Sequence, residues 1–118
     1  MADELSSLGS HQFLDDFALI YHRAVAARLR VAPEPVIKHA RNNLARWGAQ
    51  YESLSGATLT FREWEKLLEE STVEKLIALI TEDSDEGQRR RQSTPFAGVL
   101  TPEERRELLD ACEKRASA

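Results

Sequence analysis

The spacing of apolar residues along the chain predicts helices almost from end to end. Between His11 and about Val31, apolar residues recur three and four positions apart, which places them on one face of a helix. They are Phe13, Phe17, Ile20, Ala24, Ala27 and Val31. Residues 1–10 are mostly small or polar, so we expect a flexible lead-in before this helix.

Prolines separate this helix from a second one, predicted over residues 35–47. Pro33 and Pro35 end the first helix, and Pro35 suits the first turn of the next. The residues expected to face inward are Val36, Ala40, Leu44 and Trp47. Residues 49–59 contain two serines and a glycine and predict the longest loop of the chain.

Ser/Thr residues followed three positions later by Glu predict where the later helices begin. Thr60 with Glu63, and Ser71 with Glu74, fit this capping pattern. The inward residues that follow them are Phe61, Trp64, Leu68, Val73, Leu76, Ile77 and Ile80. A short helix is predicted over residues 83–92, although Gly87 weakens it.

The strongest helix start in the chain is at Thr101. Thr101 is placed as the N-cap, Pro102 as the first helical residue and Glu104 as the third. The last helix is then expected to bury Leu108, Leu109 and Cys112.

No stretch shows the alternation typical of strands. We therefore predict an all-α fold, a compact single-domain bundle of five to six helices over residues 11–114 with a flexible tail at 115–118. The residues expected to hold it together are Phe17, Trp47, Trp64, Phe96 and Leu108.

The composition fits one folded domain in the cytoplasm. The chain has 118 residues, of which 42% are hydrophobic and 31% charged, enough for a core beneath a well-solvated surface. No apolar run approaches the roughly 20 residues that span a bilayer. The N-terminus carries Asp3 and Glu4 where a signal peptide has basic residues, and the single cysteine cannot form an internal disulfide.

Charge is unevenly distributed along the chain, whose net charge is −4. Residues 21–47 hold six basic residues and one acidic, whereas residues 63–86 hold nine acidic and two basic. This indicates a charged partner surface, or two halves that pack with complementary potentials. Because the whole chain is acidic and shows no helix-turn-helix pattern, a solvated helix face explains the basic stretch better than nucleic-acid binding does.

The residue types that carry chemistry do not form a familiar motif. His11, His22 and His39 include no close pair, so we predict no metal or cofactor, and we place His22 and His39 on helix flanks, bonded to a carboxylate or a backbone carbonyl. Cys112 has no histidine near it in sequence and is interpreted as a half-buried helix residue. Phosphate loops and nucleophile elbows are absent. We therefore expect a non-enzymatic protein and no catalytic residues.

The most distinctive segment is residues 89–106, which begins RRRQSTPFAGVLTPEER. Pro95 and Gly98 indicate a tight backbone path, and Phe96 is expected to fill the core, so that residues 95–100 fix the last helix onto the bundle. Arg89, Arg90 and Arg91 then remain as candidates for contact with a partner.

Several stretches together resemble a small bacterial domain family. They are YHRAVA with Arg28-Leu29, ARNNL leading to Arg46-Trp47, Trp64 with Leu67-Leu68, and RQSTPFAGVLTPEER. The family, which we associate with actinobacteria and cyanobacteria, occurs alone or C-terminal to a helix-turn-helix region and looks like the antitoxin half of toxin–antitoxin pairs. The resemblance covers about residues 13–110. It implies an antitoxin or regulator that neutralises a nucleotidyltransferase-like toxin or a ribonuclease. This sequence shows no helix-turn-helix half, so partner binding is implied rather than operator binding.

We accordingly predict a protein-interaction domain, antitoxin-like, in which charged helix faces steer a partner and an apolar patch anchors it. The predicted partner-binding residues are Arg23, Arg41, Arg46, Arg90 and Arg91. Two alternatives stay open: a nucleic-acid-binding or transcriptional regulatory protein using the basic faces of the first two helices, and a small enzyme with a histidine-containing site. Assembly into a homo-oligomer also stays open.

Overall fold

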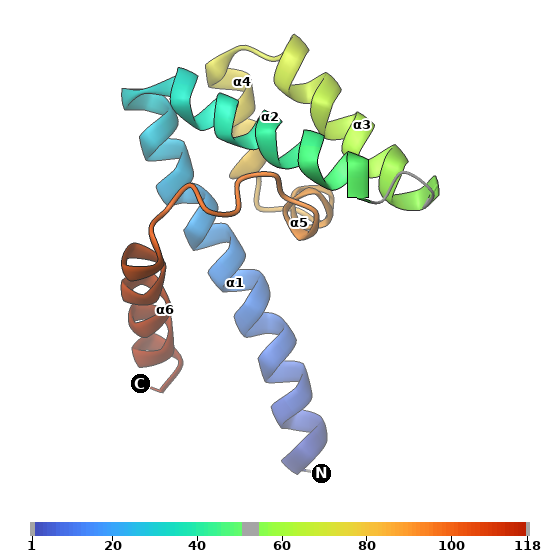
Figure 1. Ribbon diagram of the computed structural model, residues 1–118. Helices are drawn as coiled ribbons and strands as arrows, with labels where there is room; N and C mark the ends of the chain where they lie inside the picture. The colour runs from blue at the N-terminus through green and yellow to red at the C-terminus, as the bar shows by residue number, and fades with distance from the viewer. Residues whose placement is uncertain (1, 51–54, 118) are drawn as a thin grey trace.

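In the computed structural model, which describes residues 2–50 and 55–117, the chain is an all-α bundle built around its first helix (Figure 1). The helices are α1 (Ala2–Val31), α2 (Pro33–Gln50), α3 (Ser55–Glu70), α4 (Val73–Ile80), α5 (Asp85–Gln92) and α6 (Pro102–Ser117). α1 packs against α2, α4, α5 and α6, while α3 lies against α2. The predicted fold class is confirmed, and no strand occurs in the described ranges. Among these helices none is both long and apolar enough to cross a membrane.

Several predicted helix boundaries are wrong, mostly in the direction of too little helix, although α5 begins at Asp85 rather than at residue 83. α1 begins at Ala2 rather than His11, and α6 continues through most of the predicted tail to Ser117. α2 ends at Gln50 and α3 begins at Ser55, so much of the predicted 49–59 loop is helical; residues 51–54 lie outside the described part. Helices extend readily once nucleated, because each added residue gains a backbone hydrogen bond.

The helix caps separate the correct predictions from the incorrect ones. At α6 the backbone N–H of Glu104 donates to Thr101 Oγ1 (3.1 Å), and that of Thr101 donates to Glu104 Oε1 (2.9 Å), which confirms the capping box. The predicted cap at Thr60 is wrong, because Thr60 lies inside α3. α4 is capped by Thr72 rather than by Ser71, through a hydrogen bond from the Lys75 N–H to Thr72 Oγ1 (3.1 Å).

The buried face of α1 differs from the predicted one. Ala27 is exposed and Val31 is 87% exposed, whereas the buried positions follow a four-residue spacing. These are Phe17, Tyr21, Val25 and Leu29, joined by His22 and Ala26. Because four other helices pack on α1, burial spreads around it, and a single-face pattern identifies only part of that surface.

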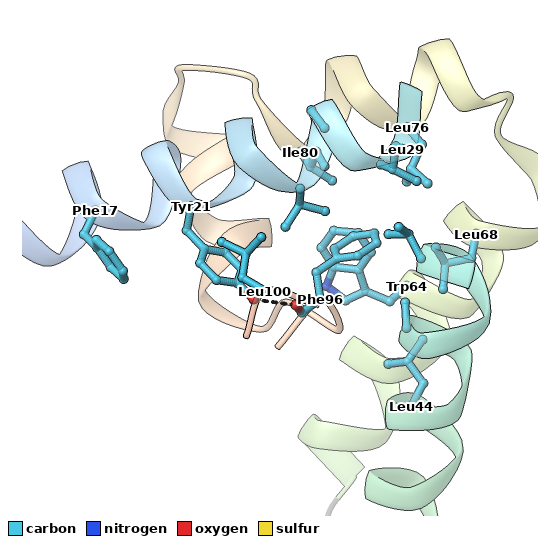
Figure 2. Close-up of a cluster of buried hydrophobic side chains, with 14 of the residues drawn as sticks. Phe17, Tyr21, Leu29, Leu44, Trp64, Leu68, Leu76, Ile80, Phe96 and Leu100 are labelled. Atoms are coloured by element: carbon cyan, nitrogen blue, oxygen red, sulfur yellow. Dashed lines mark hydrogen bonds between the residues drawn. The ribbon is translucent and has the colours of Figure 1, made fainter. Parts of the chain in front are cut away.

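Phe96 and Trp64 lie at the centre of the core (Figure 2). Their ring centroids are 5.9 Å apart and the planes meet at 88°, the edge-to-face arrangement that aromatic pairs prefer. Leucines and isoleucines from α1, α2 and α4 surround them. The predicted core roles of Phe17, Trp64 and Phe96 are confirmed, while Trp47 and Leu108 are only partly buried against this cluster.

The junction between α4 and α5 depends on Gly87 and Arg91. Nη1 of Arg91 donates to the carbonyl oxygens of Ile80 (3.2 Å) and Glu82 (2.8 Å), at the C-terminal end of α4 where helix carbonyls lack partners. Arg91, predicted as a partner-binding residue, is 5% exposed, and its guanidinium is bound within the fold. Burial lowers the pKa of Arg91. Gly87, expected to weaken α5, allows the helix to approach the Glu82 carbonyl.

Replacing Gly87 with alanine is expected to destabilise the protein by at least about 1–3 kcal/mol, because the new Cβ would lie 2.1 Å from the Glu82 carbonyl oxygen. The matched control is Gly48→Ala in α2, where a Cβ meets nothing within 4 Å. That change should stabilise the protein by up to roughly 1 kcal/mol, because alanine has a higher helix propensity than glycine. Urea unfolding of both variants measures the difference. Equal effects of the same sign would contradict the tight contact at Gly87.

Candidate functional site

The segment 93–101, which joins α5 to α6 and is here called the strap, is held by polar side chains from three helices. The Tyr21 hydroxyl donates to the Phe96 carbonyl at 2.8 Å (Figure 2). Asn43 Nδ2 donates to the Pro95 and Ala97 carbonyls, both at 2.9 Å. These helix side chains supply hydrogen bonds to carbonyls that a non-helical segment cannot satisfy by itself.

His22 continues this network into the interior. It is 1% exposed, with Nδ1 2.7 Å from the Ala18 carbonyl oxygen and Nε2 2.7 Å from Thr94 Oγ1. A carbonyl can only accept, so Nδ1 carries the proton and Nε2 accepts from the Thr94 hydroxyl. Thr94 Oγ1 in turn accepts from the Phe96 N–H at 3.1 Å. A neutral imidazole therefore satisfies the whole chain of bonds.

The environment of His22 keeps the ring neutral. Burial lowers its pKa to about 4, the hydrogen bond to Ala18 opposes that shift, and the positive charge of Arg91 adds to it. The predicted bond from His22 to a backbone carbonyl is confirmed, but the predicted position on a helix flank is wrong, since the ring is buried. Because both ring nitrogens are already occupied within the fold, His22 is engaged in positioning the strap.

His39 and Gly98 shape the middle of the strap. The Val99 N–H donates to the Phe96 carbonyl at 3.2 Å, which closes a four-residue turn over residues 96–99. Gly98 is the third residue of this turn and has a φ of 83°, a conformation that glycine adopts readily. His39 Nε2 is 2.8 Å from the Ala97 carbonyl oxygen. A Cβ at Gly98 would lie 3.1 Å from that nitrogen. The tight path predicted from Pro95 and Gly98 is confirmed.

An open groove of about 670 Å³ lies where α1, α2, α6 and the strap meet, and is here called the strap groove. Small and apolar residues of α1 and α2 form one wall, α6 forms the other, and strap residues 98–100 form part of the lining between them. The wall from α1 and α2 includes Ala24, Ala27, Val31, Ala32, Pro35 and Val36, and the wall from α6 is Glu104, Glu107 and Leu108. Its volume is in the range typical of ligand clefts.

One charge of the strap groove is unpaired. Arg28 forms an ion pair with Glu104 and also donates to the Val99 carbonyl at 3.4 Å, so it ties α1 to both α6 and the strap. Glu107 is exposed and has no ion-pair partner among the described side chains. The groove therefore combines an apolar wall with a free carboxylate.

The arginines predicted to bind a partner do not form a single surface. Arg91 is buried; Arg90 is 16% exposed and lies 3.6 Å from a carboxylate oxygen of Glu82. Arg46 donates to Asn43 Oδ1 at 2.7 Å, which supports the residue that holds the strap. Arg23 lines a smaller groove between α1 and α6, and Arg41 is exposed on α2.

Arg89, the first arginine of the triplet, is also engaged within the fold. Its Nη2 lies 2.8 Å from Glu63 Oε1 and also pairs with Glu86, so α5 is linked to α3. These hydrogen bonds raise the pKa of Arg89 and lower those of Glu63 and Glu86. At this exposed position such pairs contribute little to stability.

Sequence reasoning missed the strap groove and the anchors of the strap. The apolar spacing places Val31 on the packed face of the first helix, and it assigns no role to Asn43. A signal for Val31 was present in the sequence: it directly precedes Ala32-Pro33, where the helix ends and a side chain readily leaves the packed face. Among the described residues no cluster of three or more His, Cys, Asp or Glu could hold a metal ion.

Acidification should destabilise the protein through His22. Above pH 6.5 the ring is neutral in both states; below it the unfolded chain binds a proton that the folded protein, with a pKa of about 4, does not. From pH 7.5 to 5 this removes roughly 2 kcal/mol of stability. His22→Gln should abolish this component, as measured by urea unfolding at both pH values. A His22 ring that titrates near pH 6.5 by NMR would contradict the assignment.

Asn43→Ala is expected to cost about 1–3 kcal/mol or more, because the carbonyls of Pro95 and Ala97 lose a buried donor. The adjacent Asn42, which is exposed on the same helix, provides the control. Asn42→Ala should change the unfolding free energy by less than about 0.5 kcal/mol. Thermal or urea unfolding measures both, and similar losses for the two variants would show that Asn43 does not anchor the strap.

A scan of protein-family models, a search of curated proteins and a search of solved structures each find no match to this chain. The function of the protein therefore has to follow from its own residues. Those residues provide a strap whose polar groups are bound within the fold, and beside it an open, largely apolar groove.

Proposed function

We propose that this chain is a non-enzymatic protein-interaction domain of the cytoplasm, an antitoxin-like component that binds and neutralises a partner toxin. The observation that carries the proposal is the strap groove, with Val31 87% exposed beside small apolar residues. When a partner covers an aliphatic side chain that is this exposed, its removal from water lowers the free energy of the complex.

The network around the strap supports a binding role over a catalytic one. A histidine that acts as a general base needs a ring nitrogen free to accept a proton from a substrate. Both ring nitrogens of the buried His22 are bound within the fold, and His39 donates through Nε2 to the strap. These polar side chains hold the strap in place, and the strap in turn forms part of the groove.

The positions of the arginines favour a protein partner over a nucleic acid. Phosphate binding draws its affinity from several basic residues acting on one surface. Here Arg91 is buried and Arg46 is bonded to Asn43. Two exposed arginines without an ion-pair partner among the described side chains remain of the predicted contact residues, Arg23 on α1 and Arg41 on α2.

The test is association with the product of the neighbouring gene. Co-expression should yield a complex that survives size-exclusion chromatography, which requires a Kd below about 1 μM. Growth arrest caused by that product alone should be relieved by this chain. The control is Phe96→Asp, which places a carboxylate at the centre of the core and should abolish both effects by unfolding the domain. Absence of a complex with the wild-type chain would overturn the proposal.

A further inference from the structure

We infer that the strap groove receives an amphipathic helix of the partner, with an apolar stripe against α1 and α2 and a lysine or arginine against Glu107. This inference rests on the proposed function and specifies the chemistry of the partner segment. It follows from three features of the groove: the spacing of its lining residues, the size of their side chains and its unpaired charge.

The spacing on the two helical walls is that of helix–helix packing. α1 contributes positions 24, 27, 28 and 31, and α6 contributes positions 104, 107 and 108. Both series follow the three- and four-residue steps that form a ridge along a helix. Because α1 and α6 pack side by side (Figure 1), the space between these ridges is the place where a third helix can lie, as in helix-in-groove recognition.

The small side chains of the groove wall allow a partner helix to approach closely. Ala24, Ala27 and Ala32 line the wall formed by α1 and its junction with α2, so the wall is low and lets larger apolar side chains of a partner enter. Val31 stands beside them, 87% exposed. A docked helix would therefore bury Val31 while its own leucine-sized side chains fill the space above the alanines.

The charge of the groove selects a basic helix. The charge of Arg28 is already neutralised by Glu104, whereas Glu107 has no partner among the described side chains. Glu107 lies one turn after Glu104 on the same wall of the groove. A carboxylate beside an apolar surface attracts a lysine or arginine and repels an acidic segment, which gives the site its specificity.

The experiment uses the full chain and two fluorescent helical peptides of 18 residues. Both carry leucines at three- and four-residue spacing; the remaining positions are lysine in one peptide and glutamate in the other. Anisotropy titrations near physiological salt should show binding of the lysine peptide and at least tenfold weaker binding of the glutamate peptide. NMR of the labelled protein should place the largest amide shifts at Val31 and the strap.

Matched variants locate the contact. Val31→Asp and Glu107→Lys should each weaken binding of the lysine peptide at least tenfold, and Glu107→Lys should strengthen binding of the glutamate peptide. Leu14→Asp, at the other large exposed apolar residue of the described chain, and Glu65→Lys, on α3, should leave both affinities unchanged. Circular dichroism confirms that each variant remains helical.

Binding of the lysine peptide at the acidic residues 63–86, unaffected by Val31→Asp, would overturn the inference, as would failure of both peptides to bind. Binding of the neighbouring gene product tests the proposed function independently of the groove. If the neighbouring gene product binds the Val31→Asp and Glu107→Lys variants as well as the wild type, the groove is not its site but the function stands. If that product does not bind while the lysine peptide occupies the groove, the proposed function fails, and the preference of the groove for a basic amphipathic helix stands without that partner.

Discussion

Phe96 is the residue on which the rest of the structure depends, because the core closes around a side chain delivered by a non-helical segment. Its ring is completely buried and packs edge-on against Trp64 of α3 and His22 of α1. Its carbonyl accepts from Tyr21, and its N–H donates to Thr94. Burying such a ring contributes roughly 1.5–3 kcal/mol, but only if the backbone that carries it is also satisfied.

The backbone requirement explains why polar residues lie so deep in this small protein. Asn43, His22 and Tyr21 are nearly inaccessible to solvent, and each makes a hydrogen bond to the strap. In place of the backbone ladder of a helix or sheet, the strap is bound by side chains of α1 and α2, and Trp64 Nε1 of α3 donates to Ser93 Oγ at 3.3 Å. The same residues place the strap across the space between α2 and α6, where it forms part of the lining of the groove.

Some charged residues bind within the fold, and others are left at the groove. Arg91 closes the C-terminal end of α4, Arg28 joins α1 to α6, and Arg46 supports Asn43. Part of the positive charge that looks like a binding surface in the sequence is thus used within the fold, while Arg23, Arg30, Lys38 and Arg41 stay exposed. The unpaired carboxylate of Glu107 and the exposed Val31 are left at the groove, and they give it its chemical character.

The sequence by itself determined the all-α class, the capping box at Thr101 and the burial of Phe96, Trp64 and Leu44. These features rest on local spacing and on capping, which involve residues a few positions apart. Only the tertiary structure decided the burial of His22 and Arg91, the need for Gly87, and the exposure of Val31. The burial of His22 depends on the strap, 72 positions away at Thr94, whereas Arg91 and Gly87 depend on how the end of α4 packs against α5. A helical pattern shows that a face is apolar, but which neighbour covers it, and which part stays open, is fixed only when the helices pack.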